Sequence, residues 1–315
     1  MLISFDSNQP ITDSQGNVIA VLAPPPNDPS YHESTKRACD RMINEMAKYR
    51  FEREDLIDRL RGNDFLALNV GLSYGNGHTK PTFRNTGRFQ NLAETLVGDT
   101  NIQRLASYQD GKLISQQREN FLLISHAYIA PPTATYALWH PKAYKYYKTN
   151  LDKLWEVYPH LAQRLFPRSI MPTVAFNLGN RVATKRHIDS RNCPFGWCTI
   201  TALGDFDASK GGHLVLWDLR MILEFPAGAC VCLPSALVAH SNIPTSESEI
   251  RMSFTQYCPG EIFRHIENGF TTDEILKISD PAIMLFRKFA RETRAEEGYK
   301  MFSRVEDLLK NPARG

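Results

Sequence analysis

The stretch from residue 170 to residue 258 consists of short runs rich in β-branched and aromatic residues, and it decides the fold class. The runs read VAFNL (174–178), WCTITAL (197–203), GGHLVLWDL (211–219), MILEF (221–225), ACVCL (229–233) and RMSFTQY (251–257). Runs of this length, bounded by turn residues, are typical of β-strands. We therefore predict a compact antiparallel β domain over this part of the chain.

Helical periodicity flanks the predicted strands on both sides. Apolar residues recur near helical spacing between residues 34 and 61, where Gly62 ends the pattern, and a stripe of tyrosines and leucines runs along residues 141–166. We interpret that stripe as core packing rather than as a binding groove. The periodicity returns in EILKISD (274–280) and PAIMLFRKFARETR (281–294). The sequence thus predicts an α+β fold with helices at both ends of a β core.

The composition limits the classes of protein to which this chain can belong. With 315 residues and 42% hydrophobic content, the chain is long enough to bury a large core. The start lacks a charged region followed by an apolar run, and no stretch approaches the roughly 18 apolar residues of a membrane span. We therefore expect a soluble, intracellular protein without a membrane partner.

Six cysteines in such a protein are expected to be reduced thiols. Cys193, Cys198, Cys230 and Cys232 could in principle hold zinc, but no Cys-x-x-Cys pair occurs. Small buried side chains are the better interpretation.

The net charge of +3 does not by itself indicate a nucleic-acid partner. Lys80, Arg84 and Arg88 interleave with Phe83 and Phe89 in a stretch rich in glycine and asparagine, a mixture that can hold phosphates and stack bases. Without other evidence, this stretch is better interpreted as an ordinary surface loop. The glycines of GLSYGNG (71–77) match neither a dinucleotide fingerprint nor a P-loop, which favours a hairpin.

Three residues suit a metal centre: His187 and Asp189 in RHIDS (186–190), and His240 in VAHSN (238–242). Two imidazoles and one carboxylate are the ligands of a facial Fe(II) site with open positions, whereas a structural zinc site closes all of its positions. Residues two apart on a strand point the same way, so we expect His187 and Asp189 to reach one ion from a strand.

Arg251, eleven residues after His240, can anchor an acidic co-substrate. Its guanidinium can receive the distal carboxylate of 2-oxoglutarate in a bidentate pair, which a lysine cannot match. Ser253 lies on the same face of the predicted strand and can add a hydroxyl donor. We therefore predict Fe(II), 2-oxoglutarate and O2 as cofactor and co-substrates.

Three segments sharpen this prediction: NCPFGWCTITALGDFDASKGGHLVLWDL (192–219), LPSALVAHSN (233–242) and RMSFTQY (251–257). They resemble the catalytic domain of the fungal branch of the TET/JBP family of Fe(II)/2-oxoglutarate oxygenases, which oxidise methyl groups on DNA bases. With GLSYGNG and YALWHPKAYKYY (136–147), the resemblance spans about residues 65–270. It implies a double-stranded β-helix core, jelly-roll or cupin-like, over about residues 167–260. It also implies His187, Asp189 and His240 as iron ligands and Arg251 and Ser253 as co-substrate residues.

The resemblance further implies contacts to a flipped base. Asn192, three residues past Asp189, falls where family members hydrogen-bond the base, and Tyr257, six residues past Arg251, falls where an aromatic ring stacks on it. Pro259 stands where the best-known cytosine-oxidising members carry a histidine, so 5-methylcytosine, N6-methyladenine and thymine all stay open. The connection between Gln109 and Thr135 is longer than the family pattern, which suggests an insertion. His213 and Asp205 are further candidates near the pocket, with turn or strand-edge roles as alternatives.

These observations lead to the following interpretation. Residues 1–32, which contain APPPNDP and little periodicity, are predicted to form an extended N-terminal arm, and residues 33–315 a single catalytic domain. The domain is predicted to oxidise a base methyl group in nucleic acid, with methylated double-stranded DNA as partner, as a monomer and in the nucleus. The alternatives are hydroxylation of a protein side chain such as proline, hydroxylation of a small metabolite, or a catalytically silent DNA-binding protein. Asn192, Tyr257 and the basic loop favour a base.

Overall fold

A computed structural model describes residues 2–4, 7–58, 61–62, 64–75, 77–110, 135–283, 293 and 295–310. The suspected insertion at residues 110–134 lies almost wholly outside the described residues. None of the helices in the described part of the chain has the length and apolar character needed to cross a bilayer.

Two β-sheets form the centre of the molecule. The larger has eight strands in the order β2-β3-β10-β7-β12-β6-β4-β5, all paired antiparallel, and the smaller has four in the order β1-β9-β8-β11. In the smaller sheet, β1 pairs parallel with β9 and the other pairs are antiparallel. The strands are β1 (Leu2–Ile3), β2 (Gln9–Thr12), β3 (Val18–Ala23), β4 (Leu66–Ser73), β5 (Thr82–Phe83), β6 (Thr173–Leu178), β7 (Cys198–Asp205), β8 (Leu214–Leu216), β9 (Met221–Leu223), β10 (Cys230–Leu233), β11 (His240–Asn242) and β12 (Ile250–Tyr257).

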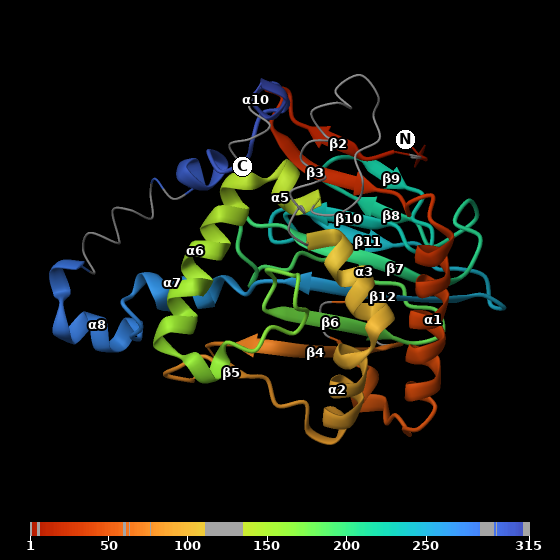
Figure 1. The fold of residues 1–315 in the computed structure, drawn as a ribbon, viewed down its shortest axis with the longest axis horizontal. Coiled ribbons are helices and arrows are strands. Elements are labelled where there is room, and N and C mark those ends of the chain that lie inside the picture. The colour runs from red at the N-terminus through yellow and green to blue at the C-terminus, as the bar shows by residue number, and fades with distance from the viewer. Residues whose placement is uncertain are drawn as a thin grey trace.

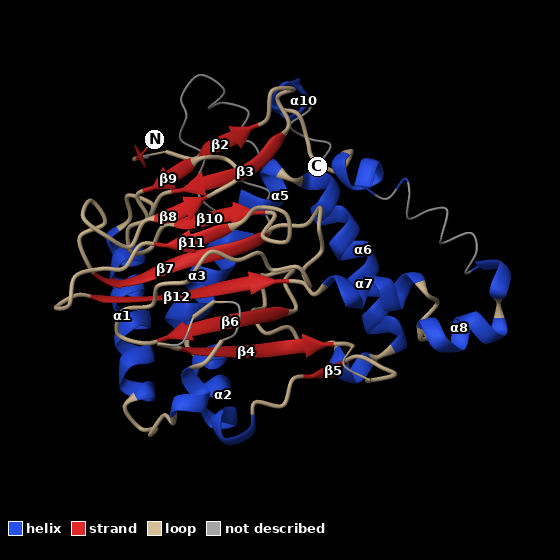
Figure 2. Ribbon diagram, turned by 180° about the vertical axis from the view of Figure 1, so that it is seen from behind, coloured by secondary structure: helices blue, strands red, loops and turns tan. Residues whose placement is uncertain are grey.

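Helices cover the face of the larger sheet that points away from the smaller one. In Figure 1 helices α1, α2, α3 and α6 lie in front of the strands, and Figure 2 shows the strands from the opposite side. The helices and 3-10 turns are α1 (Pro29–Met46), η1 (Arg53–Leu56), η2 (Gly87–Phe89), α2 (Gln90–Gly98), α3 (Thr100–Asp110), α5 (Thr135–Trp139), α6 (Pro141–Val157), η3 (Pro159–Leu161), α7 (Gly260–Glu267), α8 (Asp273–Ser279) and α10 (Val305–Lys310). The described elements therefore make a mixed α+β fold with antiparallel sheets, as the sequence predicts.

Alternation along strand β12 shows how the two faces of the larger sheet differ. Met252 and Phe254 are buried in a cluster with α1, α2 and α3, whereas Tyr257 belongs to the cluster between the two sheets. Successive side chains on a strand point to opposite faces, so Arg251 and Ser253 share the face of Tyr257. That face, toward the smaller sheet, carries the polar residues of the candidate site.

The N-terminal residues differ from the predicted arm. Strand β3 pairs with β10, with Cys230 opposite Ala23 and Cys232 opposite Val21, so residues 18–23 lie inside the larger sheet. The run VIAVLA has the length and composition of a buried strand, and burial of its side chains stabilises that pairing. Helix α1 then begins at Pro29, earlier than the periodicity suggests, because Asp28 caps it by accepting a hydrogen bond from Ser30 N at 2.9 Å.

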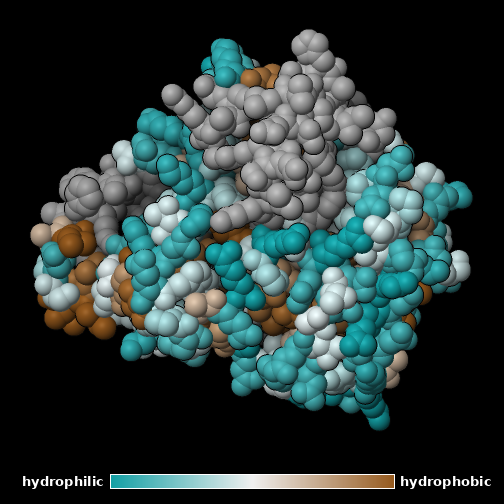
Figure 3. Space-filling model, viewed as in Figure 1, coloured by the Kyte–Doolittle hydropathy of each residue, from teal (hydrophilic) through white to brown (hydrophobic). Residues whose placement is uncertain are grey.

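The tyrosine and leucine stripe forms α6, and the expectation of core packing is confirmed. Tyr147, Leu151 and Leu154 are almost fully buried. The helix begins at Pro141 and ends before Pro159, in keeping with the fixed φ and missing N–H of proline. The surface over the helices is largely hydrophilic, and apolar atoms gather at the α8 end, where Ile278 is 85% exposed (Figure 3).

Candidate active site

His187, Asp189 and His240 come together as the sequence predicts. One ligand atom from each lies within 4.8 Å of the other two. Among the described residues, no other group of three or more histidine, cysteine or carboxylate side chains comes this close together. His187 Nε2 is 3.8 Å from Asp189 Oδ1, and the two imidazole ring centres are 4.3 Å apart. Two imidazoles and one carboxylate converging in this way form a facial-triad-like group.

The backbone around His187 differs from the predicted strand. His187 and His240 form an isolated bridge with two backbone hydrogen bonds of 3.0 and 2.9 Å, and Asp189 N–H then bonds to Ser235 O at 2.8 Å. The chain turns at Asp189–Asn192, which ends the pairing after a single bridge. The two ligands are thus held by an extended connection that binds β11, not by a strand of their own.

Both histidines are oriented by the backbone. His187 Nδ1 lies 2.7 Å from Lys185 O, and His240 Nδ1 lies 2.9 Å from Val238 O. If Nδ1 carries the hydrogen that these carbonyls require, the lone pair is on Nε2, which is the tautomer that a metal needs. Burial is the main cause, and the nearby His187 the second, of a pKa of His240 lowered to about 4, so the His240 ring stays neutral near pH 7.

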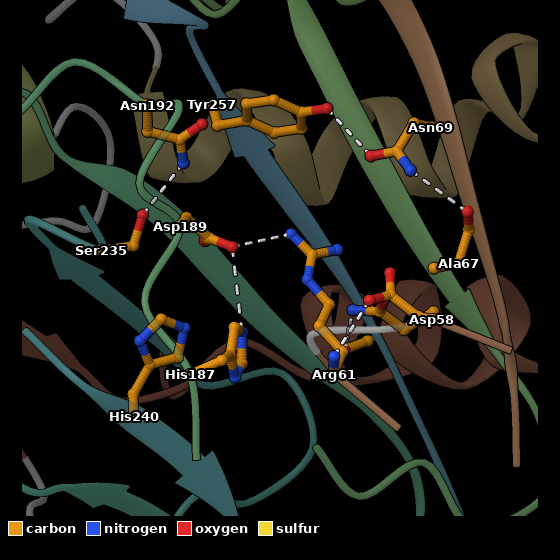
Figure 4. Close-up of polar contacts among 12 residues, drawn as sticks. Asp58, Arg61, Ala67, Asn69, His187, Asp189, Asn192, Ser235, His240 and Tyr257 are labelled. Carbon is orange, nitrogen blue, oxygen red and sulfur yellow. Dashed lines mark hydrogen bonds and ion pairs between the residues drawn. The ribbon is translucent and has the colours of Figure 1, made fainter. Parts of the chain in front are cut away.

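Asp189 has a buried cationic partner that sequence patterns did not indicate. Arg61 Nη2 donates to Asp189 Oδ1 at 3.0 Å, and the two side chains are only 15% and 10% exposed. Burial opposes ionisation of Asp189, but the guanidinium of Arg61 outweighs burial and lowers the pKa of Asp189. The carboxylate therefore stays charged and available as a ligand (Figure 4).

Arg251 is fully buried at the start of β12. Its Nη1 donates to Val182 O at 2.8 Å, while Nε and Nη2 have no hydrogen-bond partner among the described residues. Burial lowers the pKa of Arg251 to about 10, so the group keeps its charge near pH 7. A buried cation with two unpaired donors fits a carboxylate ligand, because leaving such donors without an acceptor is unfavourable.

Residues 181–189 join this arginine to the metal ligands. Val182 N–H bonds to Arg251 O, Asn242 N–H bonds to Thr184 O, and His187 pairs with His240. A rigid extended segment thus fixes the spacing between Arg251 and the three ligands. Ser253, two residues along β12, accepts a hydrogen bond from Asn177 Nδ2 at 3.0 Å.

Gly212 lies against Arg251. A Cβ at Gly212, whose φ is +71°, would meet Arg251 Cδ at 3.1 Å and the Phe206 ring at 2.7 Å, so only glycine fits there. The sequence indicated His213 as a candidate; it follows Gly212 in the chain, and its ring is a buried group whose nitrogens have no partner among the described residues.

A cavity of about 250 Å³ opens beside Asp189. Pockets for drug-sized ligands measure roughly 300–1,000 Å³, so this one suits a smaller group such as one base or one side chain. Its walls come from the η1–β4 region, the β4–β5 hairpin, the turn after Asp189 and the junction of β12 with α7. The lining residues are Asp58, Arg61, Asn69, Ser73, Tyr74, Arg84, Asp189, Ser190, Arg191, Asn192, Tyr257, Pro259 and Glu261.

Tyr257 and Asn192 both line the cavity. The Tyr257 hydroxyl donates to Asn69 Oδ1 at 2.9 Å, and Asn192 Nδ2 donates to Ser235 Oγ at 3.0 Å. Figure 4 shows both side chains on the same side of Asp189, away from the two histidines. The two residues that the family resemblance assigned to a base therefore face one space next to a metal ligand.

The basic residues of the 80–90 stretch separate. Arg84 is exposed and lines the cavity. Arg88 forms an ion pair with Asp55 and donates to Arg50 O at 3.1 Å, and Lys80 lies in the exposed turn before β5. Of the three basic residues of this stretch, the structure thus brings Arg84 to the cavity.

The cysteines form no metal site in the described part of the chain. All six are buried free thiols, and burial raises the pKa of Cys193 and Cys198 to about 12. The preference for buried thiols over a zinc site is in keeping with this placement.

No family model matches this chain, and no curated protein sequence does. Among solved structures, the chain is similar to NgTET1 in complex with 5mC DNA, at 13% identity and a TM-score of 0.48, covering 81% of this chain and 78% of that one. A 2OG-Fe(II) oxygenase family oxidoreductase from Burkholderia pseudomallei gives 13% identity, a TM-score of 0.37 and coverages of 82% and 95%. The viral collagen prolyl hydroxylase of Paramecium Bursaria Chlorella virus-1 is 11% identical, with a TM-score of 0.22, and the match covers 47% of this chain and 91% of that one. At these identities and TM-scores the similarities carry no argument about substrate.

Proposed function

We propose that this chain is an Fe(II)- and 2-oxoglutarate-dependent dioxygenase with a double-stranded β-helix core, and that it oxidises a methyl group on a nucleic-acid base extruded from its strand. The observation that carries this proposal is the shared wall at Asp189. One side of that residue faces the two histidines, and the other lines a cavity that also contains Tyr257 and Asn192.

The donor set fits the two groups that this chemistry needs. His187, Asp189 and His240 would hold Fe(II), and Arg251 with Ser253 would hold the distal carboxylate of 2-oxoglutarate. Bound iron supplies the oxidation of a C–H bond by O2, during which 2-oxoglutarate becomes succinate and CO2. Overall, R–CH3, O2 and 2-oxoglutarate give R–CH2OH, succinate and CO2.

The protein's own side chains have distinct tasks in this scheme. Arg61 keeps Asp189 ionised and oriented, and the backbone carbonyls of Lys185 and Val238 fix the imidazole rings. Arg251 is almost fully buried, so an ion pair between it and the co-substrate carboxylate would be shielded from water and strengthened.

The cavity supports a base as the substrate. Tyr257 offers an aromatic face, and stacking on such a face holds any base by about 1–3 kcal/mol. Arg84 at the exposed rim can pair with a phosphate of the target nucleotide. Extrusion is required because a methyl group inside a base stack cannot reach a buried ligand cluster.

The test is an incubation of the full chain with Fe(II), 2-oxoglutarate and duplexes that carry 5-methylcytosine, N6-methyladenine or thymine at one position. Mass spectrometry then follows the oxidised base and the succinate together. We expect an oxidised base from at least one duplex, and none with His187→Ala. Succinate release stimulated by a proline-containing peptide, with every base unchanged, would refute a nucleic-acid substrate and favour protein hydroxylation.

A further inference from the structure

Glu261 lines the cavity from the first turn of α7. Strand β12 ends at Tyr257, and α7 begins three residues later at Gly260, whose N–H bonds to Arg191 O at 2.8 Å. Asn192 and Pro259 form an isolated bridge at the same place. This junction holds the turn after Asp189 against the start of α7, so Glu261 and Asn192 enter the cavity from neighbouring backbone segments.

The carboxylate of Glu261 is not used by the fold. Within the described residues, no hydrogen bond or ion pair involves its side chain, although Arg61, Arg84 and Arg191 line the same cavity. Gly75 approaches it closely from the β4–β5 hairpin: a Cβ there would meet Glu261 Oε2 at 2.8 Å, and Gly75 has a φ of +94°. The carboxylate thus lies next to the Gly75 backbone, and a larger residue at position 75 would require the flexible end of Glu261 to shift as well as adopting a positive φ.

The neighbouring amide presents an acceptor as well. Asn192 Nδ2 already donates to Ser235 Oγ, which leaves the carbonyl oxygen of Asn192 for the cavity. Figure 4 shows that oxygen on the side of Tyr257. The amide of Asn69 accepts from Tyr257 and donates one of its two N–H groups to Ala67 O at 3.2 Å. Beside the stacking face, the Glu261 carboxylate and the carbonyl oxygen of Asn192 therefore offer acceptors, and the Asn192 amide keeps a second N–H.

Acceptors distinguish among the methylated bases. Cytosine N4 and adenine N6 carry N–H donors, whereas thymine has the acceptor O4 at the corresponding edge. A methyl group on N6 of adenine still leaves one N–H. A carboxylate thus attracts the amino-bearing bases and repels thymine, which gives discrimination by attraction and by repulsion together.

We propose that Glu261 is a specificity-determining residue that accepts a hydrogen bond from the exocyclic amino group of the extruded base, so that methylated cytosine or adenine is the substrate class and thymine is rejected. This inference rests on the proposed function. The competing explanation is that Glu261 only places negative charge at the N-terminus of α7, which stabilises a helix without contacting any ligand.

The experiment compares the full wild-type chain with Glu261→Gln, which keeps the shape but adds a donor. Glu274→Gln is the matched control, because Glu274 occupies the first turn of α8 and does not line the cavity. Each protein receives an equimolar mixture of duplexes that differ only in carrying 5-methylcytosine, N6-methyladenine or thymine, and mass spectrometry gives the ratios of kcat/KM. Anisotropy of the same labelled duplexes without iron gives binding ratios that do not depend on turnover.

For wild type we expect an amino-bearing base to be preferred over thymine. Glu261→Gln should reduce that preference about tenfold, the usual effect of losing one hydrogen bond to a charged group, and the binding ratios should change in the same direction. Glu274→Gln should leave both ratios as in wild type, and melting temperatures show whether either variant is destabilised.

Three results would overturn the inference. Unchanged ratios in Glu261→Gln, with only a lower melting temperature, would leave Glu261 as a helix-terminus charge while the proposed function stands. A wild-type preference for thymine would also refute the role of Glu261 without touching the oxygenase proposal. If wild type oxidises no base at all, the proposed function fails and this inference fails with it.

Discussion

The two ends of strand β12 serve different parts of the candidate site, and their partners come from different places in the chain. Arg251, at the start, contacts residues 181–182 and lies against Gly212, all within the β core. Tyr257, at the end, faces a cavity whose walls come from residues 58–84, 189–192 and 257–261. The co-substrate end of the site is thus held within the sheets, whereas the substrate cavity is assembled at their edge from hairpins and turns.

This difference predicts that the two halves can be damaged separately. Substitutions at the metal and co-substrate end should change metal or 2-oxoglutarate binding for every substrate. Substitutions at the cavity end should change substrate affinity or selectivity and leave the co-substrate requirement intact.

The largest effect is expected from the metal ligands. His187→Ala and Asp189→Ala each remove one of three ligands, so Mn(II) binding measured by calorimetry and all turnover should be lost. His160→Ala, at an exposed histidine of η3, is the control and should bind metal as wild type does. Metal binding that survives in both ligand variants would show that the ion binds elsewhere.

Arg61→Met should give the next largest effect, and it should depend on metal. Without metal, the variant leaves Asp189 charged and unpaired, so unfolding in urea should show a loss of about 3 kcal/mol, at the lower end for buried pairs because both side chains keep some exposure. Bound Mn(II) would neutralise the same carboxylate, so the loss should be smaller in the metal-loaded protein. Arg37→Met, in an exposed pair with Glu33, is the control. Equal losses with and without metal would contradict an ion at Asp189.

Arg251→Lys tests the co-substrate end alone. Lysine keeps the charge but cannot form the bidentate pair, so the KM for 2-oxoglutarate should rise roughly 30-fold, equivalent to about 2 kcal/mol. The KM for the nucleic-acid duplex should stay unchanged. A rise in the duplex KM with no change for 2-oxoglutarate would reverse the roles assigned to the two ends of β12.

Tyr257→Leu tests the cavity end, with the smallest expected effect. Loss of the aromatic face should weaken duplex binding about tenfold, whereas Tyr257→Phe keeps the ring and loses only the hydroxyl bond to Asn69. We therefore expect Tyr257→Phe to bind nearly as wild type, with an unchanged 2-oxoglutarate KM in both variants. Equal weakening in the two variants would mean that the hydroxyl matters, not the stacking face.

The predictability of the site follows the same division. Arg251, Ser253 and Tyr257 lie in one run, where period-two alternation is enough to place them on one face. His187, Asp189 and His240 were recognisable because their residue types match a known ligand set. Arg61, Asn69 and Glu261 have no such signal, since each is brought to the site by the packing of a distant segment, and a glutamate in the first turn of a helix is common for other reasons.

The fold shows a similar limit. Composition and turn signals were enough to predict β6, β7, β8, β9, β10 and β12, whereas the short β11 was not among the predicted runs. Strand β3 was missed, although VIAVLA has the length of a strand, because the prolines after it favoured an arm and its partner β10 is about 200 residues away. A strand at that distance is decided by tertiary pairing, which a local pattern does not report.

The central claim is that one molecule of O2 is divided between 2-oxoglutarate and a base methyl group. In the most direct measurement, the full chain receives 18O2, Fe(II), 2-oxoglutarate and a methylated duplex, and mass spectrometry gives the 18O content of both products. We predict one 18O atom in succinate and one in the hydroxymethyl base, in equal amounts. Label in succinate alone, with every base unmodified, would contradict the account.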